Sequence, residues 1–128
     1  MNTKWLMTAS ALLMGMVGIV LSFAPHEVLT SLSIPVTSTG AVIFQVLGSL
    51  YFGFAMLNWM SRGNLIGGIY SRPIAVGNLT HFAISAMALM KGYVAFHQQI
   101  ILVAAIVYVA LAASFGKVLF THPVKDKN

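Results

Sequence analysis

The sequence contains no cysteine and very little charge, with seven basic and two acidic residues among 128. The absence of cysteine excludes disulfides, thiolate metal sites and thiol redox chemistry. Only 7% of the residues are charged, against about 25% in an ordinary soluble domain. This composition, with 59% hydrophobic residues and a mean hydropathy of +0.89, excludes a soluble globular domain. It predicts a protein embedded in lipid.

Acidic residues are the scarcest charged type: Glu27 and Asp126 are the only two, and neither lies within a long apolar run. Proton-coupled exporters of this size depend on a carboxylate inside the membrane, so the sequence disfavours that class. The net charge of +5 comes without basic clusters that alternate with aromatic residues. We therefore expect no nucleic-acid partner and attribute the basic balance to the positive-inside rule.

The sequence also lacks a set of His, Asp and Glu at metal-ligand spacing on one helix. His81 and His97 fall on the same predicted helix, about 24 Å apart, and cannot share one haem iron. A surface metal held by His26, Glu27 and His97 is a geometric alternative. No nucleophile–base pair stands out. The sequence predicts no metal site, assigns no cofactor and does not support an enzyme that acts alone.

Long uncharged intervals separate the charged residues, and each interval is long enough to cross a hydrocarbon core of about 20 helical residues. Four membrane-spanning helices are predicted, over residues 5–24, 40–61, 73–96 and 98–119. We interpret residues 1–24 as a retained helix and not as a cleaved signal peptide, because the apolar run is longer than a usual signal core. The fold class is therefore all-α: an integral membrane four-helix bundle in a single transmembrane domain, residues 1–128.

The distribution of basic residues predicts the orientation. Six of the seven occur before the first span, in the second connection and in the tail, as Lys4, Arg62, Arg72, Lys117, Lys125 and Lys127, whereas residues 25–39 contain none. The seventh, Lys91, lies just inside the outer end of the third span, where its long side chain is expected to reach the outer interface. Both termini and the 62–72 connection are therefore expected on the cytoplasmic side. Trp5 and Trp59 fit interfacial anchors on that side. The turn at 97–99 is so short that the last two spans should be antiparallel neighbours.

Each predicted span carries small or polar residues at helical spacing, which in lipid is typical of a helix–helix contact. In the first span this face consists of Thr8, Ala11, Gly15, Gly18 and Ser22, and in the second of Gly48, Tyr51, Ala55, Asn58 and Arg62. From the cytoplasmic ends, Asn58 and Asn78 lie about 6 and 9 Å deep, and His81 and Tyr51 about 14 and 16 Å. These four side chains are predicted to line one pocket, with Arg62 and Arg72 at its mouth. Alternatives stay open: hydrogen bonds between helices explain the asparagines, a neutral imidazole bonded to Tyr51 or to a carbonyl explains His81, and topology alone explains the arginines.

Two successive stretches, SFAPHEVLTSLSIP (22–35) and FQVLGSLYFGFAMLNWMSRGN (44–64), together form a recognisable order of elements. A helix ends at Ala-Pro, a short loop ends at Ile-Pro, and a glycine-containing helix follows. Over about residues 15–65 the chain resembles the DoxX-like group of small four-helix membrane proteins. The resemblance implies a four-helix bundle and association with a redox or quinone-linked membrane complex. It implies no catalytic residue. The expected location is a bacterial inner (plasma) membrane.

Three functions remain open from the sequence. The first is a binding or accessory subunit of a membrane complex that holds a lipid-like or quinone-like headgroup in the predicted pocket. The second is a transporter or channel formed by a homo-oligomer. The third is a structural scaffold in which the polar residues only join helices. Membrane lipids, a second copy of the chain or a membrane-complex protein are the expected partners.

Overall fold

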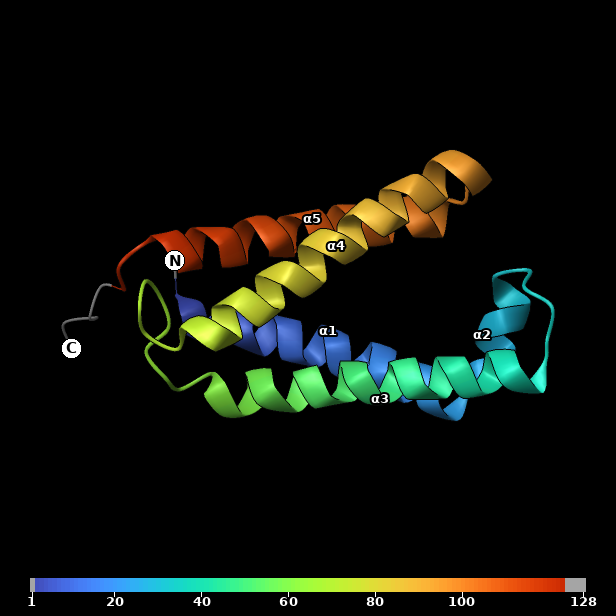
Figure 1. The fold of residues 1–128 in the computed structure, drawn as a ribbon, viewed down its shortest axis with the longest axis horizontal. Coiled ribbons are helices and arrows are strands. Elements are labelled where there is room, and N and C mark those ends of the chain that lie inside the picture. The colour runs from blue at the N-terminus through green and yellow to red at the C-terminus, as the bar shows by residue number, and fades with distance from the viewer. Residues whose placement is uncertain (1, 124–128) are drawn as a thin grey trace. The chain divides into compact units, whose positions relative to one another are not determined.

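The computed structural model describes residues 2–123 as an all-helical chain (Figure 1). The five helices of this part are α1 (Thr3–Phe23), α2 (Pro25–Ser31), α3 (Ser38–Ser61), α4 (Arg72–Phe96) and α5 (Gln99–Phe120). All but α2 are long and apolar enough to cross a membrane. The all-α class and four helices long and apolar enough to span a membrane are thus confirmed, and each end of these helices lies within two residues of the end of a predicted span. Lys125 and Lys127 lie outside the described residues.

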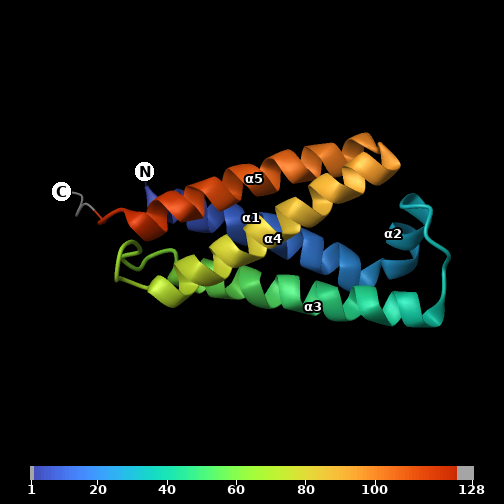
Figure 2. The same cartoon turned by 45° about the horizontal axis from the view of Figure 1, so that its top comes forward.

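The chain divides into two compact units, Met1–Gly63 and Asn64–Asn128. The first unit contains α1, α2 and α3, and the second contains α4 and α5. Each unit is built around one pair of long antiparallel helices, blue and green in the first, yellow and orange-red in the second (Figures 1 and 2).

The first unit is held by a close approach of α1 to α3 at Gly18 and Gly48. A Cβ atom added to Gly18 would lie 2.9 Å from the carbonyl oxygen of Gly48 and 2.8 Å from the backbone nitrogen of Phe52. A Cβ on Gly48 would lie equally close, 2.9 Å, to the carbonyl oxygen of Gly18. Only glycine lets two helix backbones meet at this distance, and such contacts replace the missing hydrophobic drive in lipid. Both glycines belong to the small-residue faces expected from the sequence.

The segment 25–39, expected to be a loop, begins with the short helix α2. Pro25 occupies its first turn, where the fixed φ of proline suits the helix, and Glu27 lies near its positive N-terminal end. Leu29 is fully buried, and its side chain would lie 3.5 Å from a Cβ on Gly40 near the start of α3. The loop expectation was wrong over α2, since this packing of Leu29 on α3 is not visible in a local pattern.

In the second unit, α4 and α5 are joined by two residues, His97 and Gln98. His97 adopts a left-handed conformation with φ 53°, and its N–H donates to the carbonyl of Tyr93 at 2.8 Å, which ends α4. The predicted antiparallel pair is confirmed (Figure 1). Its core includes Phe82 of α4, which stacks on Phe115 of α5 with ring centroids 5.8 Å apart and an interplanar angle of 13°.

The connection before α4 folds back onto the end of α5. Gly67 and Tyr70 exchange two backbone hydrogen bonds of 3.1 and 2.9 Å, and the N–H of Gly68 donates to the carbonyl of Val118 at 3.3 Å. Gly67 has φ 144°, a conformation that favours glycine. Ile66 beside it is buried. These glycines therefore permit a tight, packed connection.

Candidate functional site

The six residues predicted to share a pocket are divided between the two units. Tyr51, Asn58 and Arg62 lie on α3 or at its end, and Arg72, Asn78 and His81 lie on α4. The structure describes each group within its own unit, so the common pocket of six residues stays a prediction.

Asn58 joins α3 to α1. Its side chain is fully buried, and its Nδ2 atom donates to Ser10 Oγ at 3.1 Å and contacts Met14 Sδ at 3.8 Å. Ser10 in turn donates to the carbonyl of Met7 at 3.0 Å. This arrangement agrees with the interpretation of Asn58 as a hydrogen bond between helices. Ser10 had no predicted role, because the expected contact face of the first span ran through Thr8 and Ala11 instead.

The polar residues of α4 have different surroundings. Asn78 is buried, and its Nδ2 atom donates to the carbonyl of Ile74 one turn earlier at 2.9 Å. His81 is half-buried, and its ring centroid lies 5.1 Å from that of Phe82 and 5.9 Å from that of Tyr108. Within the second unit, therefore, Tyr108 of α5 is the tyrosine beside His81.

The two predicted mouth arginines also differ. Arg72 is exposed at the first residue of α4 and follows Ser71, whose φ is 51°. Arg62 is half-buried and held in place: its guanidinium carbon lies 3.5 Å from the centre of the Trp59 ring, and its Nη1 atom donates to the Trp59 carbonyl at 3.2 Å. A cation over an indole face is attracted by the ring quadrupole, so Trp59 fixes the position of this charge.

Arg62 lines a hollow of about 440 Å³ where α1 begins and α3 ends, and we call it the Lys4–Arg62 pocket. Its lining residues are Asn2, Lys4, Trp5, Thr8 and Arg62. The volume falls within the range of about 300–1,000 Å³ typical of ligand pockets. It combines two cations, an amide, a hydroxyl and an exposed indole.

Local hydrogen bonds fix the start of α1 on one side of this pocket. The side-chain oxygen of Asn2 accepts the backbone N–H of Lys4 at 3.0 Å, an N-cap that satisfies an otherwise unbonded donor. The Thr8 hydroxyl donates to the carbonyl of Lys4 at 2.8 Å. From the sequence, Lys4 was interpreted as a topology signal and Trp5 as an interfacial anchor. Their position beside Arg62 was not predicted. The sequence signal that could have predicted this pocket is the pairing of two motifs: Lys-Trp at the start of the first span, and Trp-x-x-Arg at the end of the second. Antiparallel packing places these two ends on the same side of the membrane.

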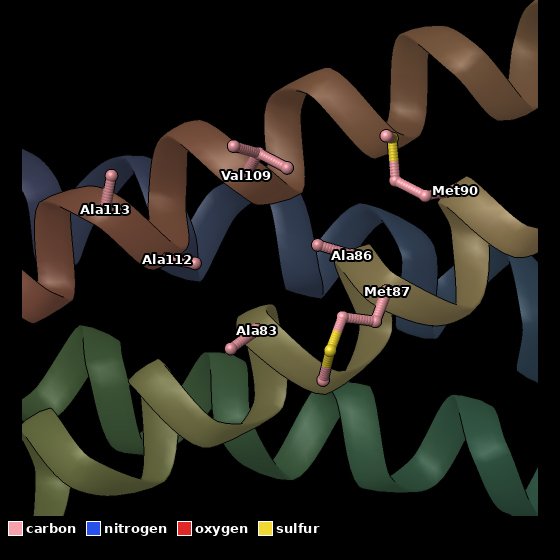
Figure 3. A pocket seen from close by; sticks show the side chains of 7 residues that line it. All are labelled: Ala83, Ala86, Met87, Met90, Val109, Ala112 and Ala113. Atoms are coloured by element: carbon pink, nitrogen blue, oxygen red, sulfur yellow. The ribbon is translucent and has the colours of Figure 1, made fainter.

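A second hollow, of about 530 Å³, lies between α4 and α5 (Figure 3). It is lined by Ala83, Ala86, Met87, Met90, Val109, Ala112 and Ala113. These side chains carry only carbon and sulfur atoms (Figure 3). The hollow therefore offers apolar contact but no directed hydrogen bond from a side chain, and it is a weaker candidate for a specific site.

Within residues 2–123, no three side chains of His, Cys, Asp or Glu are grouped so as to hold a metal ion. The three residues considered for a surface metal site fall in different units. His26 and Glu27 lie on α2 in the first unit, whereas His97 follows the last residue of α4 in the second.

Comparison with protein-family models, with curated proteins and with solved structures finds no match to this chain.

Proposed function

We propose that this four-span integral membrane protein binds the headgroup of a membrane-embedded ligand and acts as a binding or accessory subunit. The observation that supports the proposal is the Lys4–Arg62 pocket, a hollow at the ends of two long apolar helices whose lining includes two cationic side chains. Polar groups at the ends of spans lie at headgroup depth, where a lipid or a quinone presents its polar part.

The proposal includes an orientation. Lys4, Arg62, Arg72 and Lys117 all lie at or near those ends of the long helices that the positive-inside rule assigns to the cytoplasm. The Lys4–Arg62 pocket then opens at the cytoplasmic leaflet, which carries anionic lipids in most membranes. We further propose a bacterial inner membrane as the location. Membership of the DoxX-like group stays a prediction from the residues quoted above.

A structural scaffold is the second candidate, and the contacts of Asn58 favour it. A buried polar residue in a span suggests function by default, but Asn58 is accounted for by its bonds to α1. The scaffold assigns the same role to every polar residue. It predicts that substitutions at Lys4 and Arg62 alter stability or orientation and leave ligand content unchanged.

Native mass spectrometry of the protein, released gently from its own membranes, tests the proposal. We expect a discrete small molecule to be retained by the wild type and lost in Lys4→Gln. Loss in His81→Ala with retention in Lys4→Gln would instead favour the six-residue pocket. A chain without any retained molecule would contradict headgroup binding. A bare monomer would then favour the scaffold, and a bare symmetric oligomer the transporter or channel.

A further inference from the structure

We propose that the Lys4–Arg62 pocket binds a phosphate group of the kind that a phospholipid headgroup carries. This inference rests on the proposed headgroup-binding function and names its ligand class.

Charge is the first argument. Lys4 and Arg62 place two positive side chains around one hollow. Glu27, the one carboxylate within residues 2–123, lies on α2 beyond the far end of α1. Since α1 has 21 residues, this separation is about 30 Å, well beyond the screening length of about 8 Å at physiological salt. A bound anion relieves the repulsion between the two cations, whereas a neutral quinone ring does not.

The geometry of Arg62 is the second argument. The Trp59 ring lies against one face of the Arg62 guanidinium, and the Nη1 atom of Arg62 donates to the Trp59 carbonyl. A guanidinium has five N–H donors in a rigid fork, so one such bond leaves donors that match two oxygens of a phosphate. Because Arg62 is already held, less side-chain entropy is lost when the ligand binds.

The other lining residues complete the site. Lys4 adds a flexible ammonium, a point charge that phosphate sites commonly use. The side-chain oxygen of Asn2 is occupied by the α1 cap, and the NH₂ group of the same amide is a donor. Trp5 is 73% exposed, as suits an indole at the lipid–water boundary beside a headgroup. Together these groups favour a phosphate whose attached chains continue into the bilayer.

The experiment measures ligand binding by isothermal titration calorimetry on the full chain in a neutral detergent. The ligands are dioctanoyl phosphatidic acid, dioctanoyl phosphatidylcholine, inorganic phosphate and a short-chain quinone. We expect phosphatidic acid to bind, and Lys4→Gln or Arg62→Gln to weaken it by about tenfold or more, as for a hydrogen bond to a charged group. Arg62→Lys keeps the charge but loses the fork, so its affinity should lie between those of the wild type and Arg62→Gln.

Lys117→Gln is the matched control. It removes one exposed charge near the end of α5, which is predicted to lie on the same side of the membrane, and it should leave binding unchanged. Circular dichroism of each variant verifies the helical fold. If inorganic phosphate binds as tightly as the lipid, the phosphate site is supported and its ligand is soluble phosphate.

Equal affinity for phosphatidic acid in the wild type and in a folded Lys4→Gln, Arg62→Gln double variant would overturn the inference. Binding of the quinone in place of phosphatidic acid would overturn it as well, while leaving headgroup binding intact. Failure of the proposed function would give a different result. The wild type would then retain no ligand from its own membranes and would bind none of the four ligands in the titrations.

Discussion

The contact between Gly18 and Gly48 predicts a large effect from a single methyl group. In Gly48→Ala, the new Cβ would lie 2.5 Å from Ser22 Oγ, 2.8 Å from the Ser22 backbone nitrogen and 2.9 Å from the carbonyl oxygen of Gly18. The serine hydroxyl can rotate away, but the two backbone atoms cannot. The helices must therefore separate until 2.8 Å becomes at least the 3.4 Å of an ordinary van der Waals contact.

The expected cost follows from this separation. Overpacking of a well-packed contact typically costs about 1–3 kcal/mol, and the neighbouring contacts along α1 and α3 loosen with it. Alanine is the better helix former by up to about 1 kcal/mol, which offsets part of this cost. We therefore expect Gly48→Ala to lower the free energy of unfolding by up to about 2 kcal/mol after the full offset, and to be about 1–3 kcal/mol less stable than a variant with the same propensity gain and no such contact.

Gly53→Ala is the control on the same helix, since nothing lies within 4 Å of a Cβ added at Gly53. Both variants add one methyl group to α3, so they share the propensity gain and differ only in the α1 contact. The assay is chemical or thermal unfolding in detergent, followed by circular dichroism. Gly53→Ala should be neutral or slightly stabilising. The argument would be refuted if the two variants were equally stable.

The double variant Gly18→Ala, Gly48→Ala tests whether the two glycines share one contact. Once the first alanine has separated the helices, the second methyl group meets more open space. The two destabilisations should therefore sum to more than the loss measured for the double variant, as is typical of residues in direct contact. Strict additivity would indicate that each methyl group is accommodated separately.

Three further predictions concern other parts of the chain. Asn58→Ala removes the side-chain bond from α3 to α1 and should lower stability by about 0.6 kcal/mol, and by no more than about 2, in the same unfolding assay. Gly67→Ala, which forces φ 144° on alanine, should destabilise by about 1–3 kcal/mol; Gly63→Ala, with open space around it, should not. The cysteine-free chain allows the orientation to be mapped by single cysteines: a membrane-impermeant thiol reagent should label Ser33→Cys from outside intact cells and Asn64→Cys only in inverted membranes. Labelling of both from the same side would contradict the predicted topology.

The candidate site was predictable only in part. Arg62 belongs both to the predicted pocket and to the Lys4–Arg62 pocket, because a cation at the end of a span is conspicuous in an apolar sequence. Lys4 and Trp5 were recognised one by one, for orientation and anchoring. Their convergence with Arg62 depends on the antiparallel packing of α1 on α3, which brings together residues more than fifty positions apart. No local pattern contains that information.

The sequence by itself determined the all-α class and the four long apolar helices. Lipid offers no partners to the backbone, so a long uncharged run must form a helix that satisfies its own hydrogen bonds. The ends of the runs could be read from charge and proline, and the antiparallel α4–α5 pair from the shortness of its turn. These features depend on composition and chain length.

Only the tertiary structure decided which small and polar residues meet. It selected Gly18 and Gly48 from the 11 glycines for the backbone contact, and it paired Asn58 with Ser10. It also turned residues 25–31 into a helix by burying Leu29 against α3. The physical reason is that these choices depend on the rotation and crossing of whole helices, and in lipid they are governed by close packing and a few hydrogen bonds instead of by hydrophobic periodicity.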